Sequence, residues 1–428
     1  MLLRTRVFNI SLLLITISLT AVAQKRSITE KDLFQFNWIG DPQISPDGSQ
    51  VAFVRISVNE RKTGYDTSIW TVSTSGNEAP RRMTNGLHDS SPRWSPDGKM
   101  LVFVRSPEPA TPSPAGAGAG AGSGARPESP QLYMLHLGGG ESWKVTSLPR
   151  GASSPVWSPD SKWIAFNSTT NPDDLAKARK NKPDQKESEE RPGKEQGAPE
   201  KPPSQPNPEA AKTSDDAEHE SDVRVITRAV YRMNEVGYLD PKHTEHIWVV
   251  AAPQNSEDNV TPKQLTTGKY SEQNLMWSKD GRLIYFSTAR IDEPYYELPR
   301  SDLYSVPATG GEIQKIQAFD FSPRDLALSP DGTQLAFCAS VNKPVQSYTE
   351  PDLWVIDLKP GAQPRNLTTK FDYDVCSGVG GDQAPPRAAG QQKVIWAPDG
   401  KSIIAATAIQ GKANLSRFDV ASQRVTDV

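Results

Sequence analysis

Trp94-Ser95-Pro96-Asp97-Gly98 is one of six copies of a phrase that recurs along this chain of 428 residues. Four copies follow a tryptophan, and each copy precedes a short apolar strand such as Val51-Ala52-Phe53-Val54. Uninterrupted copies lie about 50 residues apart, a spacing typical of propeller blades or solenoid turns. The chain is therefore predicted to be an array of small β-sheets. The other copies are Ser45-Pro46-Asp47-Gly48, Ser158-Pro159-Asp160-Ser161, Ser278-Lys279-Asp280-Gly281, Ser329-Pro330-Asp331-Gly332 and Ala397-Pro398-Asp399-Gly400.

The phrase has the residue chemistry of a tight turn between two strands. Proline has the fixed φ required at the second position of a type I turn, and glycine follows where φ must be positive. A third strand then carries aliphatic and aromatic residues, as in Leu132-Tyr133-Met134-Leu135, and a fourth ends at an apolar-Thr pair such as Val145-Thr146. Four antiparallel strands make one propeller blade, so the predicted fold is an all-β propeller whose tryptophans pack between blades.

Residues 28–428 are assigned to this propeller. Six repeats are visible, so the ring is either six-bladed and complete, or larger and cut short. Two segments, 107–130 and 171–222, lack the apolar side chains needed to fold alone and are predicted to be disordered insertions between strands of a blade. The repeats begin near Phe36, Ser90, Ala152, Glu272, Pro323 and Gln391.

Residues 1–23 have the pattern of a secretion signal. Arg4 and Arg6 precede the apolar run Ile10 to Thr20, and Ala21-Val22-Ala23 fits a signal-peptidase site. The alternative is an uncleaved N-terminal anchor. The sequence thus predicts export to a periplasmic or extracellular compartment, with no membrane contact after cleavage.

The net charge of −3 gives no reason to expect a nucleic-acid partner. Cys338 and Cys376 are the two cysteines of the chain. Export permits a disulfide between them, and two unpaired, partly buried thiols are the alternative. A structural zinc site is not predicted, since no C-x-x-C pair occurs.

A self-sufficient catalytic set is not apparent in the sequence. There is no Gly-x-Ser-x-Gly elbow and no phosphate-binding loop, and His243 and His246 lack the i, i+4 spacing of a zincin. Asp372, Asp374 and Asp382 have side chains that bind calcium, although a solvated loop is the preferred interpretation. No catalytic residue, metal or cofactor is therefore predicted.

Several longer stretches point to a family. They are Tyr231-Arg232 with Gly237-Tyr238, Ser301-Asp302-Leu303-Tyr304-Ser305-Val306 with Gly310-Gly311-Glu312, and Pro351-Asp352-Leu353-Trp354 with Pro364-Arg365-Asn366-Leu367-Thr368. Together with the blade phrase they resemble the N-terminal β-propeller of prolyl-oligopeptidase-type serine peptidases, in the acylaminoacyl-peptidase and dipeptidyl-peptidase branch. The resemblance covers Ile28 to Val428.

The resemblance implies seven blades followed by an α/β-hydrolase domain with a Ser-Asp-His triad. About six blades and no hydrolase domain are visible here, so we expect a truncated product, a fragment or the propeller half of a split enzyme, inactive alone. In this family the propeller covers the active site and admits short peptides. The expected partners are a peptide substrate and a hydrolase domain or subunit. A stand-alone, TolB-like interaction propeller is the alternative function.

The resemblance also implies a substrate site, because propeller carboxylates of dipeptidyl-peptidase relatives bind the free ammonium of the substrate. The loop from Asp292 to Glu297 places carboxylates beside aromatic rings, a chemistry suited to an ammonium group. Arg228 and Arg232 are expected to bind a peptide carbonyl or carboxylate. An ordinary solvated loop is the alternative. The candidate ammonium-binding residues are Glu293, Tyr295, Tyr296 and Glu297.

Overall fold

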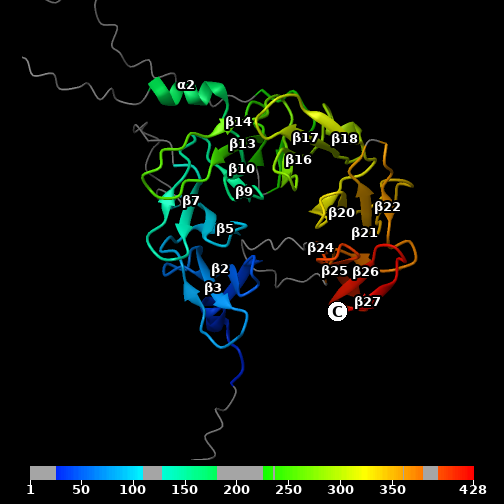
Figure 1. Ribbon diagram of the computed structural model, residues 1–428, viewed down its shortest axis with the longest axis horizontal. Coiled ribbons are helices and arrows are strands. Elements are labelled where there is room, and N and C mark those ends of the chain that lie inside the picture. The colour runs from blue at the N-terminus through cyan, green and yellow to red at the C-terminus, as the bar shows by residue number, and fades with distance from the viewer. Residues whose placement is uncertain (1–25, 109–127, 181–224, 235–236, 360, 379–393) are drawn as a thin grey trace, which may run out of the picture.

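The computed structural model of the protein describes residues 26–108, 128–180, 225–234, 237–359, 361–378 and 394–428. Six antiparallel sheets stand radially around a central opening (Figure 1). The predicted propeller of four-stranded blades is confirmed. Residues 1–23, predicted to be a secretion signal, lie outside the described residues.

In blades 1 to 3 the chain runs from the innermost strand to the outermost. Blade 1 consists of β1 (Asn37–Ile44), β2 (Gln50–Val58), β3 (Tyr65–Ser73) and β4 (Arg81–Arg82). Blade 2 consists of β5 (Asp89–Trp94), β6 (Met100–Arg105), β7 (Gln131–His136) and β8 (Trp143–Lys144). Blade 3 consists of β9 (Ser153–Trp157), β10 (Trp163–Ser168), β13 (His246–Ala251) and β14 (Lys263–Gln264).

Blades 4 and 5 keep the same order. Blade 4 consists of β15 (Gln273–Trp277), β16 (Leu283–Thr288), β17 (Asp302–Pro307) and β18 (Gln314–Gln317). Blade 5 consists of β19 (Arg324–Leu328), β20 (Gln334–Ala339), β21 (Asp352–Asp357) and β22 (Arg365–Asn366). A short 3-10 helix, η1 (Glu30–Gln35), precedes blade 1.

Blade 6 has an innermost strand in two pieces. β23 (Asp374–Val375) and β24 (Ile395–Trp396) both pair with β25 (Ser402–Ile409), and β26 (Lys412–Asp419) and β27 (Val425–Asp427) complete the sheet. The predicted start near Gln391 is therefore wrong, since the sheet already begins at Asp374. The sequence pattern showed only β24, because the innermost strand is divided and its first piece, β23, lies about 20 residues earlier in the chain.

The repeated phrase forms the predicted turn. The Ser45 hydroxyl donates a hydrogen bond to Asp47 at 2.6 Å and accepts one from the Gln50 backbone N–H at 3.0 Å, while Gly48 has a φ of 73°. The same serine-to-aspartate bond recurs in blades 2 to 5 at 2.5–2.6 Å. Each turn is thus closed by side chains of its own few residues, which is why the phrase predicts it.

These turns make stability sensitive to acid. Hydrogen bonds from Ser45 and Ser329 lower the pKa of Asp47 and Asp331 from an ordinary value of 3.8 to about 2. A carboxyl whose pKa is lower in the folded state contributes stability above the pKa of the unfolded chain, and this contribution is lost as the pH falls through the folded pKa. We expect the Tm to fall between about pH 4 and pH 2.

The variant Asp47→Asn/Asp331→Asn should lose less Tm over that interval than the unmodified protein, because it has two fewer carboxylates to protonate. Thermal unfolding followed by circular dichroism at each pH measures this, with pH 7 as the reference. Parallel Tm curves for the two proteins would contradict the role assigned to these aspartates.

The tryptophans join neighbouring blades. The indole Nε1 of Trp94, Trp157, Trp277 and Trp396 donates a hydrogen bond to a backbone carbonyl on the innermost strand of the preceding blade, at 2.9–3.1 Å. Trp157 and Phe166 of blade 3 share one buried cluster with Val102 and Met134 of blade 2. The predicted packing role of the tryptophans is confirmed.

The threonine of each apolar-Thr pair ties the fourth strand to the third. Its hydroxyl oxygen accepts a hydrogen bond from a buried backbone N–H near the start of the third strand, at 2.9–3.1 Å. A buried backbone donor is costly to leave unpaired, so this bond explains why the position calls for threonine. The threonines are Thr84, Thr146, Thr266 and Thr368.

A residue with positive φ, between 45° and 56°, lies in the innermost strand of blades 1 to 5 and directly after β23 in blade 6. These residues are Asp41, Ser91, Ser154, Asn274, Asp325 and Cys376. In blades 1 to 5 it lies within a register shift of the ladder, which marks a β-bulge. In blade 6 the same conformation occurs at Cys376, where the chain leaves the sheet. The connection between β23 and β24 thus begins at the position where the other blades have their bulge.

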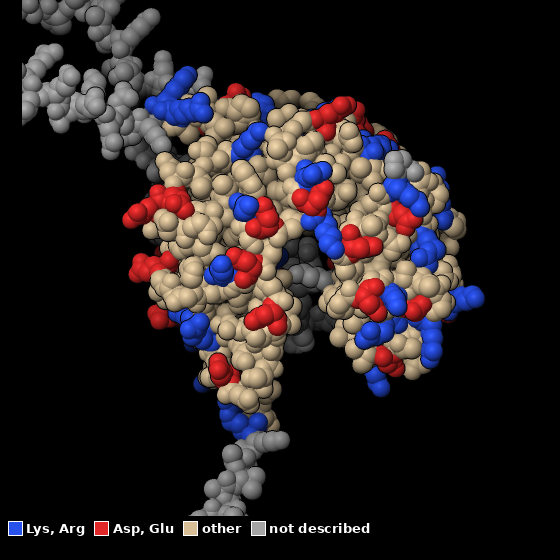
Figure 2. All heavy atoms as spheres, viewed as in Figure 1, with Lys and Arg blue, Asp and Glu red and all other residues tan. Residues whose placement is uncertain are grey.

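The arc of blades is open between blade 1 and blade 6 (Figures 1 and 2). At the place where blades 2, 3, 4 and 6 carry tryptophan, blade 1 carries Ile44, which is 65% exposed to solvent. Ile395 and Leu415 of blade 6 are exposed as well. Apolar side chains of both terminal blades thus remain uncovered. Figure 2 also shows that charged side chains of both signs are interspersed over this face.

The segment 171–222, predicted to be a disordered insertion, begins with a helix. Helix α2 (Pro172–Lys180) packs Leu175 against the core shared by blades 2 and 3. The carboxylate of Asp174 contacts Arg150 at 3.4 Å and His243 at 3.2 Å. These partners lie far away in the sequence, so the composition of the segment did not reveal the helix. Residues 181–222, and most of 107–130, lie outside the described residues.

Candidate functional site

The candidate residues lie on connections between the second and third strands of blades 3 and 4. Because the strands alternate in direction, these connections lie at the end of each blade opposite to the Ser-Pro-Asp-Gly turns. Blade 3 contributes the small ladder of β11 (Arg232–Met233) and β12 (Gly237–Tyr238). Blade 4 contributes the short 3-10 helix η2 (Pro294–Tyr296).

Asp292 anchors the blade 4 connection. Its carboxylate contacts the Lys269 ammonium at 2.5 Å and accepts a hydrogen bond from the Tyr270 hydroxyl at 2.8 Å. Lys269 first, then Tyr270, and also the charge of Arg228, lower the pKa of Asp292. The structure therefore brings the charge of Arg228 close to this loop, although the two are distant in sequence.

The two glutamates of the loop differ in their surroundings. Glu297 forms an ion pair with Arg300 at 2.9 Å, and this bond raises the pKa of the Arg300 guanidinium. The half-buried Glu293 carboxylate has no hydrogen-bond or ion-pair partner among the described residues. Glu293 is thus the glutamate of this loop that is left open to a ligand.

Two exposed tyrosines follow Glu293 in the same loop. Tyr295 and Tyr296 are 67% and 78% exposed, and their rings meet edge to face with centroids 5.1 Å apart. Exposed aromatic rings and an open carboxylate in one loop have the chemistry that an ammonium group needs. Glu293, Tyr295 and Tyr296 therefore stay candidates for ammonium binding, whereas Glu297 is paired with Arg300.

Arg232 is engaged within the blade 3 ladder. Its guanidinium lies 5.6 Å from the ring centroid of Tyr238, which in turn lies 6.1 Å from the ring of Tyr231. This contact keeps the arginine on its own hairpin. Arg228 acts on the blade 4 connection through its charge, which contributes to the lowered pKa of Asp292.

The histidines noted in the sequence take structural partners. His243 lies between Asp174 at 3.2 Å and Asp240 at 2.6 Å, and His246 bonds to the buried Glu272 at 2.8 Å. Over the described ranges, no group of three or more His, Cys, Asp or Glu side chains is arranged to hold a metal ion. Asp382, one of the three loop aspartates, lies outside those ranges.

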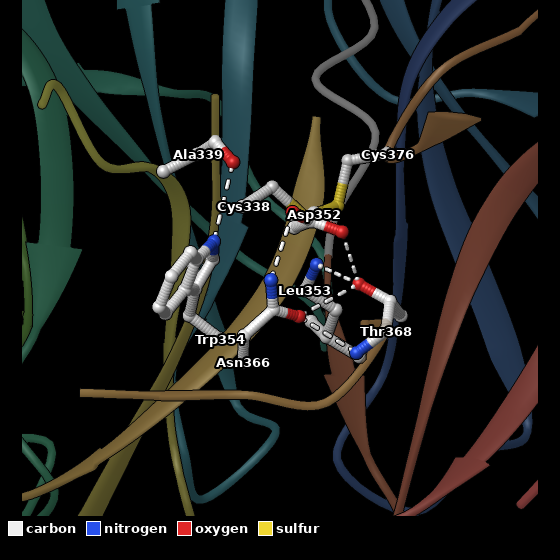
Figure 3. The surroundings of a disulfide bond; sticks show 8 residues. All are labelled: Cys338, Ala339, Asp352, Leu353, Trp354, Asn366, Thr368 and Cys376. Carbon is white, nitrogen blue, oxygen red and sulfur yellow. Dashed lines mark hydrogen bonds between the residues drawn. A yellow bond between two sulfur atoms is a disulfide. The ribbon is translucent and has the colours of Figure 1, made fainter. Parts of the chain in front are cut away.

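Cys338 and Cys376 form a disulfide with Cα atoms 6.3 Å apart (Figure 3). Cys338 belongs to β20 of blade 5, and Cys376 directly follows β23 in blade 6. The bond crosses from one blade to the next, beside the hydrogen-bonded side chains of Asp352, Asn366 and Thr368.

No helix in the described part of the chain has the length and apolar character to span a bilayer.

The chain is similar to peptidases in sequence. No family model matches it. Uncharacterized peptidase YuxL of Bacillus subtilis is 36% identical over 142 residues, which cover 33% of this chain and 19% of that protein. Dipeptidyl-peptidase 5 of Porphyromonas gingivalis is 24% identical over 225 residues, which cover 48% and 28% of the two chains.

Solved peptidase structures share the fold. Acylaminoacyl peptidase of Pyrococcus horikoshii matches 94% of this chain and 48% of its own, with a TM-score of 0.54 and 15% identity. The propeller domain of the Trilobed protease of Pyrococcus furiosus matches 92% and 85%, with a TM-score of 0.50 and 14% identity. The chain spans about half the length of the acylaminoacyl peptidase and less of the curated relatives.

Proposed function

We propose that this propeller binds and admits peptide substrates for an exported serine peptidase of the prolyl-oligopeptidase type. Peptide-bond cleavage is assigned to a hydrolase domain in the same or another polypeptide. The similarity in sequence to peptidases and the shared propeller fold support this proposal. A domain that covers a hydrolase excludes water and selects substrates by size.

The observation that carries the proposal is the open carboxylate of Glu293 in the same short loop as the exposed Tyr295 and Tyr296. In this arrangement Glu293 receives the ammonium group of a peptide N-terminus, and the tyrosine rings attract the same positive charge. Asp292 and Glu297 are held by Lys269 and Arg300, so neither competes for the ligand. The site thus distinguishes a free N-terminus from a blocked one.

Binding of short peptide amides to the purified chain tests this role. Two tripeptide amides labelled with fluorescein on a side chain, one with a free N-terminus and one acetylated, are titrated by fluorescence anisotropy at pH 6.5. We expect the free amine to bind about tenfold more tightly, since a charged hydrogen bond contributes on the order of 1.5–3 kcal/mol. The preference should disappear above about pH 9, where the amine is neutral.

The variant Glu293→Gln should abolish this preference, while the matched control Glu297→Gln should retain it because Glu297 is already paired with Arg300. Equal affinity of both peptides for the unmodified protein would refute the ammonium site. Hydrolysis of dipeptidyl chromogenic substrates by this chain alone would refute the division of labour. Binding of a folded periplasmic protein instead of peptides would favour the stand-alone interaction propeller.

A further inference from the structure

Three blades place an arginine over an aromatic ring at the same structural position. The ring lies on the third strand, directly opposite a phenylalanine of the second strand. The guanidinium carbon lies 4.5–4.7 Å from the ring centroid in each blade. The three arginine–ring pairs are Arg55–Trp70, Arg105–Tyr133 and Arg290–Tyr304.

In blades 1 and 2 the guanidinium also has an acceptor on the innermost strand of its own blade. Arg55 donates a hydrogen bond to the Asn37 side chain at 2.9 Å. Arg105 donates two hydrogen bonds to the buried carboxylate of Asp89, at 2.7 and 3.0 Å. In both blades the guanidinium plane contacts the aromatic ring, and its N–H groups donate to the acceptor on the innermost strand.

Blade 4 supplies its arginine from another position. Thr288 occupies the place of Arg105, and its buried hydroxyl has no partner in the described part of the chain. Arg290 follows two residues later and lies 4.5 Å from the Tyr304 ring and 5.9 Å from the Tyr270 ring. Its exposed guanidinium forms ring contacts, and no hydrogen bond or ion pair to the described residues.

The Tyr304 ring that Arg290 contacts is packed against a second ring, and the nearby carboxylates of Asp302 and Asp292 already have lysine partners. Tyr304 is buried and stacks on Phe286 with ring centroids 5.9 Å apart. Lys315, which also contacts the Tyr304 ring, is paired with Asp302 at 2.8 Å. Lys269, over the Tyr270 ring, is paired with Asp292. Arg290 is therefore a fixed cation with unused donors.

We infer that Arg290 binds a carboxylate group of a ligand. The planar guanidinium offers parallel N–H donors that match the two oxygens of a carboxylate, and a guanidinium already ordered on rings loses little conformational freedom on binding. Arg290 and Glu293 lie on the same blade 4 connection, which thus has one site for each sign of charge. That the ligand is a peptide rests on the proposed function, whereas the carboxylate site does not.

Acetylated, unlabelled tripeptides test this site without the N-terminal ammonium on which the Glu293 test depends. One has a free C-terminal carboxylate and no acidic side chain, the second is its C-terminal amide, and the third is an amide with one glutamate side chain. Affinities are measured by isothermal titration calorimetry for the unmodified chain, Arg290→Gln and Arg290→Lys. Arg55→Gln is the matched control, since its guanidinium is already bonded to Asn37.

We expect at least one carboxylate peptide to bind the unmodified chain about tenfold more tightly than the neutral amide, as a charge-assisted hydrogen bond would give. Arg290→Gln should remove this difference, Arg290→Lys should retain part of it, and Arg55→Gln should leave it unchanged. The peptide that gains affinity identifies the C-terminus or the acidic side chain as the ligand. Equal affinities in the unmodified chain, or a difference that survives Arg290→Gln, would overturn the inference.

Discussion

Replacement of Trp157 by alanine is expected to lower the free energy of unfolding by about 3–5 kcal/mol, as large-to-small changes of buried aromatic residues do. Trp157 is 7% exposed and lies in the cluster that joins blade 3 to blade 2. Its indole also donates a hydrogen bond to the backbone carbonyl of Arg93 at 3.0 Å. The substitution leaves a cavity between two blades and an unpaired carbonyl.

Two further variants separate these contributions. Trp157→Phe keeps most of the packing but loses the indole hydrogen bond. That bond adds about 1 kcal/mol to the destabilisation caused by the smaller side chain. Trp163→Ala, at a position 45% exposed in the same blade, should cost less than about 1 kcal/mol. Guanidinium unfolding followed by circular dichroism measures all three. A Trp157→Ala variant as stable as Trp163→Ala would show that the inter-blade cluster contributes little.

Removal of the disulfide is expected to destabilise the protein by about 2–4 kcal/mol. The bond joins residues 38 positions apart in sequence and therefore restricts the unfolded chain considerably. It also fixes the first piece of the innermost strand of blade 6 to blade 5. The variant Cys338→Ala/Cys376→Ala suits this test. Both cysteine side chains are buried, and alanine places no polar atom there.

Reduction provides the matched control. A reducing agent should lower the stability of the unmodified protein to that of the double alanine variant and should leave the variant unchanged. Titration of thiols in the unfolded, unreduced protein should find none. Two titratable thiols, or a variant as stable as the parent, would show that the bond does not hold the last blade in place.

Much of the fold was accessible from local sequence. The Ser-Pro-Asp-Gly turn closes through its own side chains, as Ser45 and Asp47 show, and the threonine of each apolar-Thr pair bonds to the neighbouring strand of its own blade. Because the turn phrase recurs about every 50 residues, it identifies the strands beside it even when their partners in the sheet are unknown. The period failed in blade 6, because the innermost strand is divided between Asp374 and Trp396.

The sequence also located the blade 4 loop, but it did not show which of its charges are available. Glu293 and Glu297 have the same chemistry, and the difference between them is the position of Arg300 in space. Arg290 is open because Glu272, the carboxylate of blade 4 that corresponds to Asp89, bonds to His246 and Thr266 instead. Turns and strands depend on residues adjacent in the chain, and for that reason the sequence alone determined them. The availability of a charge depends on side chains that other strands bring near, and only the tertiary structure decided it.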